Sequence, residues 1–266
     1  MPSTRTTTVT YGHMRTRTPD PGRRATHTDL TVLAGVRGAR ARVRSLVTAH
    51  PGAPRVRPML LASGTDWARV ALVAEGALLL AGDHVTVSVD VGPGVHLSVV
   101  EPSGVVAYAM RGRSASWTID IHQRPGSTLV WHGQPFVAAD GAVVERTTTA
   151  DLAADAELLL RETIVLGRSG ESAGTVRTRS AIRSDGLAVL VEELLLSPAT
   201  QVAGLLGDHR VLDTVLAIGP GAVDHPHRLD LEPVGHLYRK LLNETHLSDL
   251  SGVWSVLERS QSLTEV

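Results

Sequence analysis

Tight turns recur about every thirty residues between residues 83 and 196, at positions 91–94, 124–126, 152–155 and 184–186. Between the turns, apolar and polar residues alternate, as in Val85, Val87 and Val89 against Thr86 and Ser88. This alternation is typical of β-strands with one buried face. Because a hairpin cannot bury its apolar face alone, successive units must pair or stack to form a common core.

We therefore expect a mainly β protein, a large layered assembly of stacked hairpins that is β-solenoid-like or built from several sheets. An ordinary β-sandwich whose hairpins have similar lengths is the alternative. Aromatic residues make up only 3% of the chain and Phe136 is the single phenylalanine. The core must therefore be filled mainly by Val, Leu, Ile and Ala, and branched aliphatic residues suit a pleated sheet.

The ends of the chain differ from this pattern. Residues 1–25 are rich in Arg, Thr and Pro and predict a disordered basic tail. Residues 26–266 predict a single β domain. After the breaker at 219–221, apolar residues recur at spacings of three and four, which predicts a short helical C-terminal segment with helices from about residue 234; these residues are Leu237, Leu241, Leu242, Leu247, Leu250, Val253, Trp254 and Leu257.

Charge and cysteine content limit the class of protein. Lys and Arg number 26 against 27 Asp and Glu, which gives no electrostatic reason to expect a nucleic-acid or membrane-surface partner for the whole chain. There is no cysteine, no run of eighteen apolar residues and no apolar segment after the basic N-terminus. A location in the reducing cytoplasm, with no membrane span or signal peptide, is the expectation.

Two motifs suggest chemistry of their own. Residues 170–174 match G-x-S-x-G around Ser172, but the alternating residues that follow predict a strand, whereas a nucleophile elbow needs a helix there. His225 and His227, separated by proline, form the densest histidine cluster and could contact nickel or zinc weakly, although a solvated loop is the favoured explanation.

Acidic residues inside apolar strands carry more information. Glu162, Glu192 and Glu193 interrupt leucine-rich stretches, so alternation turns some of them towards the interior or an interface. A carboxylate held there needs a partner or access to water. An arginine partner, such as Arg161 or Arg179, is the competing explanation.

Several segments, in order, resemble one family. Residues 80–94 are similar to the GGD and V-x-V-x-PG signature of the urease accessory protein UreD (UreH) family. Residues 129–135 resemble its L-x-W-x-P-Q segment, and residues 158–168 resemble its W-E-x-x-x-x-G-R segment. The resemblance covers about residues 28–260. The chain departs from the family at 99–110, where Glu101 and its neighbours replace a Thr-Thr-Gln sequence.

The resemblance implies a non-enzymatic scaffold that binds urease apoprotein and UreF and, through UreF, the GTPase UreG. It also implies transient passage of Ni²⁺ with no tightly bound cofactor, and it is compatible with a dimer within the accessory complex. Asp83 and Glu162 match the family motifs and are the first candidates for lining the metal route. His225 and His227 are the other candidates. A hydrolase using Ser172 or the Glu192/Glu193 pair, and a purely structural β-repeat module, are the alternatives.

Overall fold

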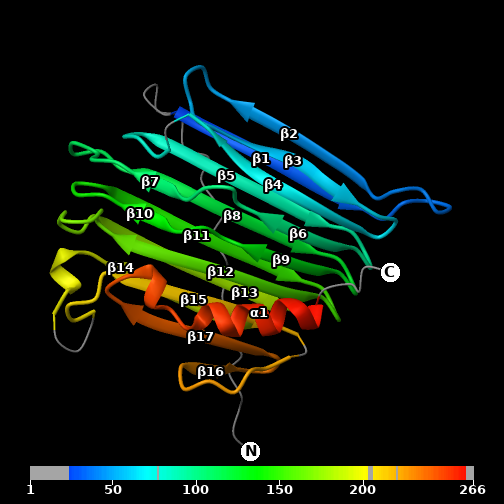
Figure 1. The fold of residues 1–266 in the computed structure, drawn as a ribbon. Helices are drawn as coiled ribbons and strands as arrows, with labels where there is room; N and C mark the ends of the chain where they lie inside the picture. Colours follow the sequence, from blue (N-terminus) through cyan, green and yellow to red (C-terminus); the bar gives the residue numbers. More distant parts are fainter. Residues whose placement is uncertain (1–23, 77, 203–205, 220, 262–266) are drawn as a thin grey trace, which may run out of the picture.

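The computed structural model of the chain describes residues 24–76, 78–202, 206–219 and 221–261 (Figure 1). It confirms a mainly β fold with a β-solenoid-like arrangement. Two large sheets pack face to face, and the one α-helix of the described residues lies against the outside of one of them. The prediction of a basic tail at residues 1–25 lies outside the described residues except for Arg24 and Ala25, which begin the first strand.

Sheet A contains seven strands in the order β14-β13-β11-β8-β5-β1-β2. Its strands are β1 (Arg24–Leu33), β2 (Arg42–Ala49), β5 (Asp83–Val91), β8 (Ala115–Gln123), β11 (Val143–Leu152), β13 (Thr175–Ser184) and β14 (Leu187–Leu196). The five inner strands run parallel to one another: β1, β5, β8, β11 and β13. The edge strands β2 and β14 are antiparallel to their neighbours.

Sheet B follows the order β16-β17-β15-β12-β9-β6-β4-β3; in addition, the short strand β10 pairs with β12, and the short strand β7 pairs with β10. Its strands are β3 (Arg55–Ser63), β4 (Trp67–Glu75), β6 (His96–Val100), β7 (Val105–Ala107), β9 (Thr128–His132), β10 (Phe136–Ala138), β12 (Glu157–Leu166), β15 (Val211–Ile218), β16 (Arg228–Leu231) and β17 (Gly235–Leu242). The strands β4, β6, β9 and β12 are parallel, and the remaining long strands are antiparallel.

The recurring turns connect the two sheets. The turns at 92–94, 124–126 and 153–156 lead from β5 to β6, from β8 to β9 and from β11 to β12, each time from sheet A to sheet B. Only the turn at 184–186 closes a true hairpin, between β13 and β14. Reading the first three turns as hairpins was wrong, because alternation shows which residues are buried but not which strand pairs with which.

The repeat seen in the sequence is therefore the repeat of the solenoid. Successive parallel strands of sheet A begin at Asp83, Ala115, Val143 and Thr175, intervals of 32, 28 and 32 residues. Each coil of chain stacks on the previous one through parallel pairing in both sheets. The inward side chains of both sheets, Val and Leu above all, form one continuous core.

The C-terminal region is partly strand where helix was expected. Residues 235–242 form β17, between β15 and β16, so the prediction of helices from about 234 was wrong there. Both faces of β17 are covered: Leu237 packs in the core between the sheets and Tyr238 packs on the opposite side. Apolar residues on both faces of a strand imitate helical spacing. Helix α1 (Leu250–Gln261) confirms the later part of the prediction.

Helix α1 covers part of the outer face of sheet B (Figure 1). Its buried residues, Leu250, Val253, Trp254 and Leu257, pack on β9, β12, β15 and β17 in a second apolar cluster. No helix in the part of the chain that the structure describes is long and apolar enough to cross a membrane.

Candidate functional site

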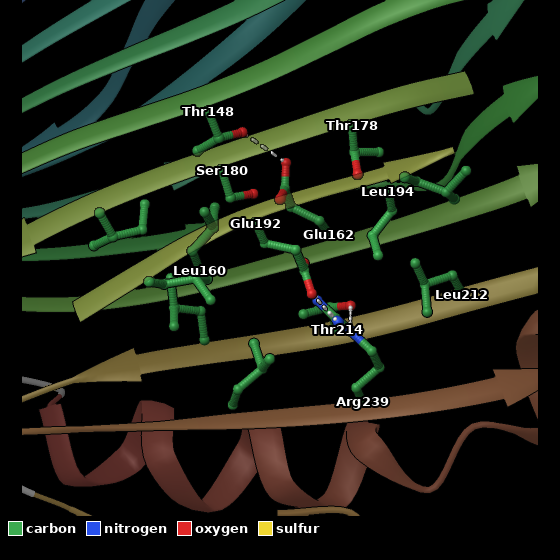
Figure 2. Close-up of a pocket in the computed structure, with 15 residues that line it drawn as sticks. Thr148, Leu160, Glu162, Thr178, Ser180, Glu192, Leu194, Leu212, Thr214 and Arg239 are labelled. Atoms are coloured by element: carbon green, nitrogen blue, oxygen red, sulfur yellow. Dashed lines mark hydrogen bonds and ion pairs between the residues drawn. The ribbon is translucent and has the colours of Figure 1, made fainter. Parts of the chain in front are cut away.

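A small cavity of about 40 Å³ lies between the two sheets, where β14 faces β17 (Figure 2). Its volume is enough for a few water molecules. Its walls combine leucine and isoleucine side chains with two carboxylates, one guanidinium and four hydroxyls. The lining residues are Thr148, Leu160, Glu162, Ile164, Thr178, Ser180, Ile182, Leu190, Glu192, Leu194, Leu212, Thr214, Leu216, Leu237 and Arg239.

Glu162 enters the cavity from β12, because alternation along this strand turns residues 160, 162 and 164 inward. Its Oε1 accepts hydrogen bonds from Arg146 Nη2 at 2.8 Å and from Thr148 Oγ1 at 3.2 Å. Arg146 also lies 5.1 Å from the centre of the Phe136 ring. The inward orientation predicted for Glu162 is confirmed, and its arginine partner comes from sheet A.

Glu192 lines the same cavity from the edge strand β14 and makes a bidentate ion pair with Arg239 of β17, at 2.6 and 2.7 Å. The pair joins sheet A to sheet B at the side of the cavity. Glu193 points the other way and pairs with Arg177 and Arg179 on the outer face of sheet A. Glu192 and Glu193 therefore do not form the carboxylate pair that the hydrolase alternative requires.

A third interior carboxylate, Glu101, was not among the predicted site residues. Its two oxygens accept hydrogen bonds from Trp131 Nε1 at 2.9 Å and from the Gln134 backbone N–H at 3.0 Å. Burial raises the pKa of Glu101, while these two hydrogen bonds and the charge of Arg146 act in the opposite direction. Glu101 replaces a polar residue of the family pattern, and that departure was the only feature of the sequence that pointed to this carboxylate.

Asp83 lies away from this cavity, at the start of β5. Its side chain is fully buried. Its Oδ1 accepts a hydrogen bond from Arg24 Nε at 2.7 Å, and its Oδ2 accepts one from the Leu80 backbone N–H at 2.7 Å. The residues around it in sequence form the turn into β5. Both carboxylate oxygens thus hold the beginning of the solenoid together.

His225 and His227 lie outside the sandwich, in the segment before β16. Their ring centres are 5.5 Å apart, and the ring of His225 meets the ring of Tyr238 edge to face. His225 Nε2 is 3.7 Å from Asp249 Oδ2. Among the described residues, no group of three or more His, Asp or Glu side chains is arranged to hold a metal ion. The structure does not bring these histidines together with Glu162 or Asp83.

The cavity offers carboxylate and hydroxyl oxygens that could bind a metal ion, but arginine side chains already pair with both carboxylates. Glu162 and Glu192 are each neutralised by an arginine, Arg146 and Arg239 respectively. Carboxylate and hydroxyl oxygens are ligands for hard and borderline divalent cations. A cation in this cavity would have to displace a guanidinium to gain a carboxylate. The arrangement therefore favours brief contact over tight binding.

Ser172 lies exposed in the segment between β12 and β13. The residues after it lead directly into strand β13, as the sequence predicted. A nucleophile elbow places its serine between a strand and a helix. The G-x-S-x-G match therefore lacks the structural context of a serine hydrolase.

A second buried polar cluster fastens helix α1 to sheet B. Asp213 of β15, whose side chain is 1% exposed, pairs with Arg161 of β12 at 2.8 Å and accepts a hydrogen bond from Thr163 Oγ1 at 2.8 Å. Ser248, just before the helix, donates to the same carboxylate, and Arg161 reaches Ser251 in the first turn. The cluster lies on the face of sheet B opposite the cavity.

His132 of β9 stacks on Trp254 of helix α1, with ring centres 4.7 Å apart. Burial, reinforced by the nearby charge of Arg161, lowers the pKa of His132. The unfolded chain therefore takes up a proton on this residue at a higher pH than the folded protein does. We expect the free energy of unfolding to fall as the pH drops below about 6.5, the unperturbed value for histidine.

This pH dependence is measured by urea denaturation between pH 7.5 and 5. His132→Phe keeps a ring against Trp254 and should reduce the slope of stability against pH, whereas His122→Gln, at an exposed position of β8, serves as the control. Because burial also lowers the pKa of His96, the slope will shrink but not vanish. Equal slopes for wild type and His132→Phe would contradict the prediction.

Comparisons with known proteins agree with this fold and these motifs. The sequence model of the family described as UreD urease accessory protein matches residues 27–261. The chain is 44% identical to "Urease accessory protein UreD 1" of Streptomyces griseus, over 81% of this chain and 86% of the relative. It is 33% identical to "Urease accessory protein UreD" of Streptomyces coelicolor, over 74% of this chain and 83% of the relative. The chain therefore belongs to the UreD family of urease accessory proteins.

Proposed function

We propose that this protein is a cytoplasmic scaffold for urease maturation. It binds urease apoprotein and UreF and, through UreF, the GTPase UreG, and it assists the insertion of nickel without catalysing a reaction itself. Membership of the UreD family supports the general role. The observation that carries the nickel part is the cavity between the sheets, where Glu162 and Glu192 are each held by an arginine.

In this proposal Ni²⁺ is cargo. Glu162 offers the ion an oxygen ligand inside the protein, and Thr148 beside it supplies a hydroxyl. Arg146 takes back the carboxylate when the ion leaves, so the metal does not stay. Asp83, His225 and His227 stay predictions: Asp83 has both oxygens engaged, and the two histidines lie on the outside of sheet B.

The direct test is reconstitution of urease. Urease apoprotein, UreF and UreG are expressed with wild-type protein or with Glu162→Gln, and urease activity and nickel content are measured. Glutamine keeps an acceptor for Arg146 and Thr148 but loses the negative charge. We expect about a tenfold loss of both readouts, the size typical of a disturbed metal-site residue.

Glu193→Gln is the matched control, because Glu193 is a β14 carboxylate on the outer face and does not line the inner cavity. It should leave nickel loading unchanged. Full loading with Glu162→Gln would remove the cavity from the route of the metal. Active, nickel-loaded urease in cells that lack this chain altogether would overturn the proposed function itself.

A further inference from the structure

The edge strand β3 exposes three consecutive large apolar side chains. Met59, Leu60 and Leu61 are 50%, 52% and 54% exposed. The pairing with β4 shifts register between Leu60 and Ala62, so Leu61 has no partner on β4. A run of three exposed apolar residues is unfavourable in water and indicates a contact surface.

The beginning of β3 is held against the neighbouring strand β1. The hydroxyls of Thr26 and Thr28 of β1 donate to the backbone oxygens of Pro54 and Val56, so β1 closes over the beginning of β3. No such bond covers Met59–Leu61 among the described residues. Pro58 lies just before the run, and a proline in an edge strand discourages pairing with a further strand. Contact through side chains is therefore favoured over strand addition.

The same end of the molecule is strongly basic. Residues 34–69 contain seven arginines and one acidic residue, Asp66, and all seven arginines are exposed. Glu75, at the end of β4, pairs with Arg57 at 2.8 Å, so the arginines remain in excess. They lie on β2, β3, β4 and the connection between β1 and β2, and β2 and β3 also carry the exposed Leu46 and the apolar run. These strands lie together at one end of the molecule (Figure 1). These arginines are Arg37, Arg40, Arg42, Arg44, Arg55, Arg57 and Arg69. We call β2, β3 and this set the basic apolar end.

We propose that the basic apolar end docks a partner protein through an acidic surface that surrounds an apolar contact. This proposal rests on the proposed function, since it takes the partner to be a component of urease maturation. Charge complementarity selects the acidic partner. A second copy of this chain would bring arginines against arginines across a two-fold axis. A nucleic acid would satisfy the arginines but would leave Met59, Leu60 and Leu61 without an apolar partner.

The test measures binding of UreF and of urease apoprotein separately, each immobilised, to wild type and to two variants. Leu60→Asp with Leu61→Asp removes the apolar contact, and Arg55→Glu with Arg69→Glu reverses charge at exposed positions that leave the core intact. One of the two proteins should bind each variant at least about tenfold more weakly, the loss typical of interface hot spots. Its affinity for wild type should also fall with salt.

Val191→Asp is the control, because Val191 is 75% exposed on β14, at the opposite edge of sheet A. It should bind like wild type. Wild-type binding by both variants overturns the docking proposal and leaves the proposed function standing, whereas a wild-type protein that binds neither UreF nor urease overturns both. Loss with the leucine variant alone would overturn the acidic character of the partner. A dimer that dissociates in the leucine variant, or tight binding to DNA, would also overturn the proposal.

Discussion

Replacing Asp213 with alanine is expected to destabilise the protein by about 3–5 kcal/mol, the cost of removing one member of a buried ion pair. The substitution leaves Arg161 buried without its counter-charge and removes the acceptor of Thr163 and Ser248. Because Ser248 precedes helix α1, the helix should also lose protection from hydrogen exchange first. Chemical denaturation at neutral pH measures the loss of stability.

Asp151→Ala, at an exposed position on β11, is the matched control and should stay within about 0.5 kcal/mol of wild type. Arg161→Met combined with Asp213→Leu should be less harmful than Asp213→Ala alone, since a buried pair replaced by apolar residues leaves no isolated charge. If Asp213→Ala cost less than about 1 kcal/mol, the cluster would be unimportant for stability.

Replacing Trp131 with alanine is the second large effect, about 3–5 kcal/mol for a large aromatic residue in a core. Trp131 is 1% exposed and packs among the inward residues of both sheets. The substitution also removes the donor to the buried carboxylate of Glu101. Thermal or urea unfolding gives the size of the loss.

Trp131→Phe separates the two contributions. Phenylalanine keeps most of the packing but cannot donate to Glu101, and a hydrogen bond to a charged group is worth about 1.5–3 kcal/mol. Glu101→Gln in the Trp131→Phe background should recover part of that loss, because it removes the buried charge. No recovery would mean that the loss arises from packing alone.

The architecture was largely readable from the sequence because it repeats. Alternation such as Val85, Val87, Val89 fixed which residues are buried, and the regular turns fixed the length of the repeat. The pairing of the strands was not readable, because a turn between two sheets and a turn within a hairpin use the same types of residue. Strand β17 was mistaken for helix because Leu237 and Tyr238 are buried on opposite faces.

The candidate site was readable only in part. Alternation turned Glu162 and Glu192 inward, and because neighbouring residues of a strand point to opposite faces, Glu192 and Glu193 do not form a pair. The partners that define the interior, Arg146 for Glu162 and Trp131 for Glu101, come from strands 16 and 30 residues away. Such contacts depend on how the coils stack, and no local pattern records them.

The ion pair between Glu192 and Arg239 affects how easily the two sheets can separate. In three successive coils of the solenoid, four-residue turns carry the backbone directly from sheet A to sheet B. Where β14 faces β17, each strand pairs only within its own sheet, and the side chains of Glu192 and Arg239 join the two strands. Separating β14 from β17 therefore breaks the Glu192–Arg239 ion pair and apolar packing, and it leaves the pairing of each strand within its own sheet intact.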